Sequence, residues 1–200
     1  MSDATYYLTT PLYYVNAPPH LGHAYTTGIA DVLARYRRLR GDPVFFLTGT
    51  DEHGQKIQQA AAAAGKPPQQ FADEIVPNFT ALWKTLNISQ NDFIRTTEPR
   101  HVRGVQAVLT RLFEQGLILK DTYEGWYCTP CETFWPALMV PGVPGTPGTM
   151  CPDCRRPVER IHEQNYFFPL EPHRSWLVEY IRTHDTFIVP VTRRNEVLAF

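Results

Sequence analysis

The first three predicted elements of this chain, taken in order, leave few possible folds. Residues 6–10 form a β-like run, a helical segment extends from Ala24 to about Arg40, and residues 44–47 form a continuous apolar run. Turn residues at 40–43 end the helix, and a short apolar run bounded by such residues predicts a strand buried on both faces. Strand, helix and strand in this order predict a right-handed βαβ unit, a parallel sheet and therefore an α/β fold.

Changes in composition divide the chain into three segments. We expect an α/β domain at 1–116, an insertion too small for its own hydrophobic core at 117–165, and a return to ordinary sequence at 166–200. Pro77 is expected to kink or divide the helix in which it lies. The patterns predict a strand at 93–96 and helices at 55–64, 67–86, 99–114, 172–183 and 194–200.

The stretch from Tyr13 to His23 predicts an anion site. It links the first strand to the first helix and ends in His20-Leu21-Gly22-His23. Backbone N–H groups at a helix start point outward, and the macrodipole places partial positive charge there. Two histidines three residues apart share a helical face, so both can donate to one phosphate. Capping histidines or a stray metal pair are the plainer interpretation, but the strand, Gly22 and a third histidine at the next strand end favour phosphate.

A second polar cluster follows the second predicted strand, where Asp51, Glu52 and His53 end the run. Ligands of open α/β sheets bind beyond the carboxyl ends of the strands. We therefore expect residues 11–23 and 48–53 to face one crevice.

Two pairs of interpretations stay open at this crevice. Asp51 either binds the ammonium group of an amino-acid substrate or caps the helix that starts near Gln55. Leu12, Tyr13 and Tyr14 either line a substrate pocket or belong to an aromatic cluster in the core.

Four cysteines form two Cys-x-x-Cys pairs, Cys128 with Cys131 and Cys151 with Cys154, separated by 19 residues. This spacing predicts a zinc ribbon in which four thiolates surround one tetrahedral Zn²⁺. Redox or disulfide pairs are the alternative. A structural zinc is favoured because the segment lacks a core and all four ligand positions would be filled.

Bulk properties exclude some classes of protein. Hydrophobic residues make up 43% of the chain and charged residues 20%, which is typical of a globular chain and not of a disordered one. The net charge of -1 argues neither for nor against nucleic-acid binding. Residues 1–5 lack the pattern of a signal peptide and no apolar run approaches about 20 residues, so we expect a cytoplasmic protein.

These motifs resemble the methionyl-tRNA synthetase family. Residues 9–27, which contain the His-x-Gly-His element, look like the first signature of that family, and residues 45–54 look like its second. Residues 92–97, 165–168 and 194–197 also look like the family, so the resemblance spans essentially the whole chain.

The resemblance implies a Rossmann-type, parallel-sheet catalytic domain of class I synthetases, interrupted by a small connective insertion with a zinc knuckle. It implies ATP-dependent activation of L-methionine to methionyl-adenylate and transfer to tRNA(Met), with one structural Zn²⁺ per chain and Mg²⁺ accompanying ATP. It also implies site residues. His20 and His23 would be catalytic and would bind ATP with Tyr13, Asn16 and Gly22. The methionine site would comprise Leu12, Tyr14, Asp51 and His53, and the metal ligands would be Cys128, Cys131, Cys151 and Cys154.

The family's Lys-Met-Ser-Lys-Ser loop and its anticodon-binding domain do not occur in these 200 residues. We therefore expect an N-terminal portion of such an enzyme, inactive alone. Two alternatives remain: another His-x-Gly-His nucleotidyltransferase, or a zinc-knuckle module that binds RNA or protein without catalysis.

Overall fold

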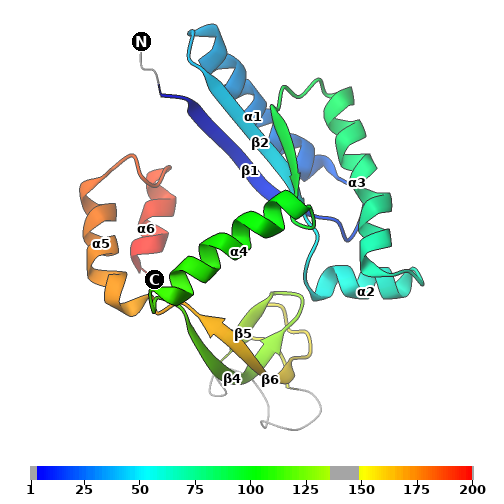
Figure 1. The fold of residues 1–200 in the computed structure, drawn as a ribbon, viewed down its shortest axis with the longest axis vertical. Coiled ribbons are helices and arrows are strands. Elements are labelled where there is room, and N and C mark those ends of the chain that lie inside the picture. The colour runs from blue at the N-terminus through cyan, green and yellow to red at the C-terminus, as the bar shows by residue number, and fades with distance from the viewer. Residues whose placement is uncertain (1–3, 136–148, 200) are drawn as a thin grey trace. The chain divides into compact units, whose positions relative to one another are not determined.

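A computed structural model describes residues 4–135 and 149–199. Three parallel strands, β1 (Tyr6–Tyr14), β2 (Val44–Asp51) and β3 (Asp92–Arg95), form a sheet in the order β1-β2-β3 (Figure 1). Helix α1 (Leu21–Leu39) connects the first two strands. The βαβ unit and the parallel sheet predicted from the sequence are confirmed.

Strand β1 is longer than predicted and continues through Pro11 to Tyr14. The pairing with β2 shifts its register between Thr9 and Leu12. Proline has no N–H to donate to a ladder, and strands tolerate it at such irregularities. The extension matters because it carries the tyrosines at the end of β1 to the carboxyl edge of the sheet.

Helices α2 (Gln55–Ala63) and α3 (Pro68–Thr85) follow β2. Helix α3 continues through Pro77, so the proline does not divide it as one form of the prediction had it. Together with the end of β1 they enclose a buried core made of Tyr13, Val15, Ile57, Ala72, Val76, Phe79 and Trp83. A second small core packs α1 against β2. The carboxyl edge of the sheet therefore packs against a buried core.

Helix α4 (Pro99–Glu114) leads to the second sheet, in which β4 (Leu119–Cys128), β5 (Thr133–Trp135) and β6 (Glu159–Phe167) have the order β5-β4-β6. Strands β4 and β5 are antiparallel. The part of the predicted insertion at 136–148 lies outside the described residues. A small buried cluster beside this sheet includes Cys128 and Cys151.

The last described elements are a short 3₁₀ helix, η2 (Glu171–His173), and helices α5 (Arg174–Thr183) and α6 (Val191–Ala199).

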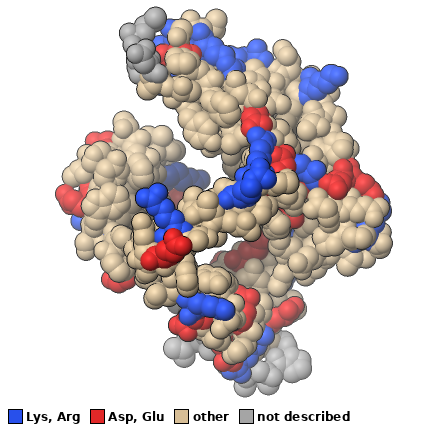
Figure 2. All heavy atoms as spheres, viewed as in Figure 1, with Lys and Arg blue, Asp and Glu red and all other residues tan. Residues whose placement is uncertain are grey.

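The chain divides into two compact units. The first comprises Met1–Ala107 and Trp126–Glu159, and the second comprises Val108–Gly125 and Arg160–Phe200. Among the described residues, no helix is long and apolar enough to cross a membrane. Basic and acidic side chains are interspersed on the face drawn in Figure 2, as a net charge of -1 suggests.

Candidate active site

A pocket of about 320 Å³ lies where β1 ends and α1 begins. This is the carboxyl edge of a parallel sheet, where α/β folds bind their ligands. All of its lining residues except Ala17 and Pro18 are among the site residues that the sequence predicts. The lining comprises Leu12, Tyr13, Tyr14, Asn16, Ala17, Pro18, His20 and His23.

The two histidines form a reciprocal capping box at the start of α1. His20 is the N-cap, and the N–H of Gly22 donates to its Nδ1 over 3.0 Å, while the N–H of His20 donates to Nδ1 of His23, also over 3.0 Å. A ring nitrogen that accepts a hydrogen bond carries no proton, so each neutral imidazole holds its proton on Nε2. The pair therefore keeps two Nε2–H donors on rings that line the pocket.

The expectation that backbone N–H groups at this helix start point outward is wrong for most of the first turn. Imidazole nitrogens accept the N–H groups of His20 and Gly22, and the carbonyl of His20 accepts those of His23 and Ala24. The side chains thus satisfy donors that a helix start normally leaves free. An anion here would meet imidazole N–H groups more than backbone. The helix begins at Leu21, three residues earlier than predicted.

Gly22 makes room for the His20 ring. A Cβ at this position would lie 2.9 Å from Cε1 and 3.1 Å from Nδ1 of His20. The absence of a side chain at Gly22 thus leaves space for the imidazole that caps the helix.

Tyr13 packs against His23 from the core side. Their ring centroids are 4.9 Å apart in an edge arrangement, and the Tyr13 hydroxyl shares a 2.8 Å hydrogen bond with Thr27 of α1. Tyr13 is 7% exposed and belongs to the core, as one of its two interpretations predicts, and it also lines the 320 Å³ pocket. Burial, followed by the neighbouring His20, lowers the pKa of His23, which favours the neutral ring.

Asp51 ends β2 and is the register partner of Tyr14. Its Oδ1 accepts a long 3.3 Å hydrogen bond from the N–H of His53. The N-cap of α2 is Gly54, and no side chain in the described part of the chain caps that helix, so Asp51 does not cap it. Asp51 is half-buried and His53 is exposed, and neither lines the 320 Å³ pocket.

Glu52, the carboxylate next to Asp51, has a structural role. Its side chain is fully buried, and Arg95 donates to both of its oxygens over 2.7 and 2.8 Å. Thr50 and Thr97 donate to the same carboxylate. Burial by itself would raise the pKa of Glu52, but the hydrogen bonds from Arg95, Thr97 and Thr50 outweigh it and hold the pKa below its usual value. This ion pair joins the end of β2 to β3.

Sequence reasoning did not find two residues that contact Tyr14. The Tyr14 hydroxyl donates to Oε2 of Glu132 over 2.8 Å, and Lys56 approaches Oε1 of Glu132 to 3.1 Å. The Lys56 ammonium also lies 5.2 Å from the centroid of the Tyr14 ring. The hydrogen bond to Glu132, then burial and the charge of Glu132, raise the pKa of Tyr14 to about 12. No local pattern signals a contact across 118 residues.

The four cysteines converge as predicted. Their sulfurs all lie within 4.8 Å of one another, with 3.5 Å between Cys128 and Cys154 and 3.9 Å between Cys131 and Cys151. No disulfide joins them. Four thiolates around a tetrahedral Zn²⁺, each about 2.3 Å from the metal, lie about 3.8 Å apart, so the donor set and its spacing fit such an ion.

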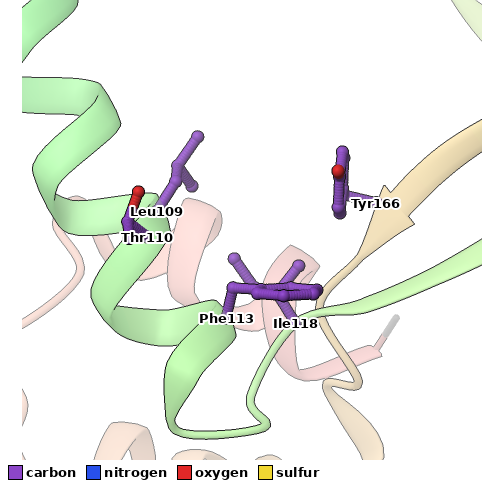
Figure 3. Close-up of a pocket in the computed structure, with 5 residues that line it drawn as sticks. All are labelled: Leu109, Thr110, Phe113, Ile118 and Tyr166. Atoms are coloured by element: carbon purple, nitrogen blue, oxygen red, sulfur yellow. The ribbon is translucent and has the colours of Figure 1, made fainter.

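A second pocket, of about 240 Å³, lies between α4 and β6 and is mostly apolar (Figure 3). The ring of Phe113 meets that of Tyr166 edge to face, with centroids 5.9 Å apart. Leu109, Thr110 and Ile118 complete the lining, so among the residues that the structure describes the only ionisable group in it is the Tyr166 phenol. Of these two pockets, the histidine pocket is therefore the better candidate for catalysis.

Comparisons with known proteins identify the class of this chain. A family model described as "tRNA synthetases class I (M)" matches residues 6–199, so the chain belongs to the class I aminoacyl-tRNA synthetases. Within that class, it belongs to the methionyl-tRNA synthetase family. It is 51% identical to the methionine–tRNA ligase of Thermotoga maritima over 193 residues, which are 96% of this chain and 30% of that protein. The chain spans about 30% of the length of the first curated relatives it matches.

Two crystal structures of the Mycobacterium tuberculosis methionyl-tRNA synthetase resemble the chain. The structure bound by methionyl-adenylate matches with a TM-score of 0.91 and 41% identity over 98% of this chain and 39% of that one. The apo structure matches with a TM-score of 0.73 and 36% identity over 98% of this chain and 36% of that one. The predicted family and α/β fold class are therefore confirmed.

Proposed function

We propose that this chain forms the N-terminal part of the catalytic domain of a methionine–tRNA ligase. In the proposed reaction the methionine carboxylate attacks the α-phosphorus of ATP, giving methionyl-adenylate and pyrophosphate. The methionyl group then passes to the 3′ end of tRNA(Met) in the cytoplasm. One observation carries the proposal. His20 and His23 line a pocket at the sheet edge, and the Nδ1 atom of each ring accepts a backbone N–H.

His20 and His23 take the catalytic roles in this proposal. Their Nε2–H groups would donate to phosphate oxygens, where charge builds as the α-phosphorus is attacked. Fixed donors stabilise such charge well because they need not reorganise during the reaction. Gly22 leaves space for the first ring and Tyr13 supports the second. Asn16, in the lining of the same pocket, would complete the ATP site.

The methionine site would lie beside the ATP site. Leu12 and Tyr14 line the pocket and would border the methionine side chain. Asp51 pairs with Tyr14 across the sheet, and its carboxylate would hold the α-ammonium group. His53 lies two residues beyond Asp51 and would complete this side. In this proposal residues 1–116 and 166–200 belong to the catalytic domain, and residues 117–165 form the connective insertion.

The cysteine cluster would hold one Zn²⁺ through Cys128, Cys131, Cys151 and Cys154. Four thiolates fill a tetrahedral shell and leave no position for water, so the ion would cross-link the insertion without taking part in chemistry. Mg²⁺ would accompany ATP, because this ion commonly binds through substrate phosphates. A zinc-knuckle binding module without catalysis is disfavoured because the family match covers residues 6–199.

Methionine-dependent ATP–pyrophosphate exchange tests the proposal. The full protein that contains this chain should catalyse the exchange with methionine, and residues 1–200 alone should show little or none. Exchange by the full protein with another amino acid but not with methionine would contradict the substrate. Robust exchange by residues 1–200 would contradict the assignment of the remaining phosphate contacts to sequence outside this chain.

A further inference from the structure

A carboxylate from the cysteine-bearing turn reaches the pocket wall. The turn between β4 and β5, residues 128–133, is called the cysteine loop here. Within it Glu132 directly follows Cys131, and its φ of 53° lies in the left-handed region. A residue other than glycine rarely adopts this conformation unless its surroundings enforce it. Here the backbone carries the Glu132 side chain to Tyr14, a lining residue of the 320 Å³ pocket.

The cysteine loop contacts the pocket side of the α/β domain at several points. Glu132 accepts the Tyr14 hydroxyl at one oxygen and meets the Lys56 ammonium at the other. Thr129 of the same loop donates to the side chain of Gln55 at the start of α2 over 3.0 Å. Tyr14 is therefore held at its hydroxyl by Glu132 and approached at its ring by Lys56.

The hydrogen bond between Tyr14 and Glu132 lies outside the buried core, against which the Tyr14 ring packs. Tyr14 is the last residue of β1, and the buried core beside it is formed by Tyr13, Val15 and the residues of α2 and α3. Tyr14 is only half-buried, so water could satisfy its hydroxyl. What the hydrogen bond to Glu132 adds is a fixed orientation of an aromatic ring at the pocket. Such orientation affects binding of a ligand more than it affects folding.

We propose that Glu132 is a positioning residue for methionine: it fixes the Tyr14 ring at the proposed methionine site and makes that site depend on the fold of the cysteine loop. The inference rests on the proposed function. Glu132 touches no substrate in this scheme and acts through Tyr14. ATP binds through the histidines, so its binding does not depend on Glu132.

The test uses the full protein and compares Glu132→Ala, Glu132→Gln, Tyr14→Phe and the double variant Glu132→Ala/Tyr14→Phe. Glu159→Ala, at an exposed position at the start of β6, is the matched control. The dissociation constant of methionine is measured by calorimetry, KM for methionine and for ATP by pyrophosphate exchange, and zinc content by elemental analysis.

Glu132→Ala and Tyr14→Phe should each weaken methionine binding by about tenfold, because the bound ligand would then have to order a Tyr14 ring that the free protein no longer fixes. The double variant should be no worse than either single variant, because both remove the same contact. Glu132→Gln, which keeps an acceptor oxygen, should recover most of the affinity, and Glu159→Ala should match wild type. KM for ATP and zinc content should stay unchanged throughout.

Three results would overturn the inference while leaving the proposed function intact. These are unchanged methionine affinity in zinc-replete Glu132→Ala, equal losses for methionine and ATP, and additive losses in the double variant. If Glu132→Ala fails to fold, Glu132→Gln and Tyr14→Phe decide: unchanged methionine affinity in Tyr14→Phe overturns the inference. Failure of the wild-type protein to bind methionine would instead overturn the proposed function.

Discussion

The imidazole rings of His20 and His23 stack with their centroids 3.9 Å apart, and each Nδ1 accepts a backbone N–H from the turn that carries them. One nitrogen of each ring therefore builds the helix start, and the other remains a donor at the pocket. Structure and proposed chemistry share the same two side chains but use different atoms. Substitutions that replace one atom and not the other can separate the two roles.

His20→Asn should separate them. The side-chain oxygen of asparagine is among the best N-cap acceptors, but asparagine has no donor at the place of Nε2. We expect a melting temperature near wild type and a kcat for pyrophosphate exchange lowered by about 10²- to 10³-fold, the usual effect of removing one transition-state donor. His20→Ala should lose the same rate and also about 1 kcal/mol of stability. A stable His20→Asn protein with normal kcat would contradict the phosphate role.

Gly22→Ala should disturb the same ring by crowding it. The new Cβ would lie 2.9 Å from Cε1 of His20, so the imidazole must shift. We expect kcat to fall about 10- to 100-fold, as small misplacements of catalytic groups do. Gly28→Ala is the control, because a Cβ there meets nothing within 4 Å. In a helix interior that change should stabilise by about 0.5 to 1 kcal/mol and leave kcat unchanged. Equal kcat in both variants would show that Gly22 is not needed for the ring.

Glu52→Gln should lower the free energy of unfolding, because it removes one member of the Glu52–Arg95 ion pair between the end of β2 and β3. Removing one member of a fully buried ion pair costs about 3 to 5 kcal/mol, but Arg95 is partly exposed and also binds Asp73, so we expect about 2 kcal/mol. The folded-state pKa of Glu52 is lowered, so the folded state binds fewer protons, and the contribution is present above the usual pKa of 4.5 and lost as the pH falls below it.

Urea unfolding at several pH values measures this effect. The difference in unfolding free energy between wild type and Glu52→Gln should be largest near pH 7 and shrink below pH 4.5. Glu74→Gln, which breaks an exposed pair with Lys66, should differ little from wild type. A difference that persists undiminished to low pH would mean that packing, and not charge, stabilises the contact between β2 and β3.

Local patterns predicted most of the elements but fewer of their ends. Helix α4 runs from Pro99 to Glu114 as predicted, because its boundaries coincide with a proline and a glycine signal. The start of α1 was missed because a histidine serves as N-cap, a role that sequence rules give to serine, threonine, aspartate and asparagine. The first strand was predicted to end at Thr10, but it continues through Pro11 because a shift in register accommodates the proline.

The site was predictable where its residues are neighbours in sequence. His20 and His23 share one turn, and the paired cysteines follow a spacing that the metal geometry dictates. Glu132 was not predictable, because its contact with Tyr14 depends on how the cysteine loop packs against the end of β1. Spacing and residue type report on local geometry, whereas such tertiary contacts leave no periodic trace in the sequence.

Cys151→Ser should release the metal and unfold the insertion while leaving the parallel sheet intact. The sulfurs of Cys128 and Cys151 are buried in the small core beside Trp126, so a metal there would hold together a segment that has few other apolar contacts. Elemental analysis should find about one zinc per wild-type chain and none in the variant. In hydrogen exchange, the backbone amides of residues 126–135 and 149–159 should lose protection, whereas those of β2 should keep it.

Asp153→Asn, at an exposed position between Cys151 and Cys154, is the control and should keep the metal. Full zinc content in Cys151→Ser would refute the ligand set, and lost protection in β2 would mean that the sheet depends on the insertion for its stability.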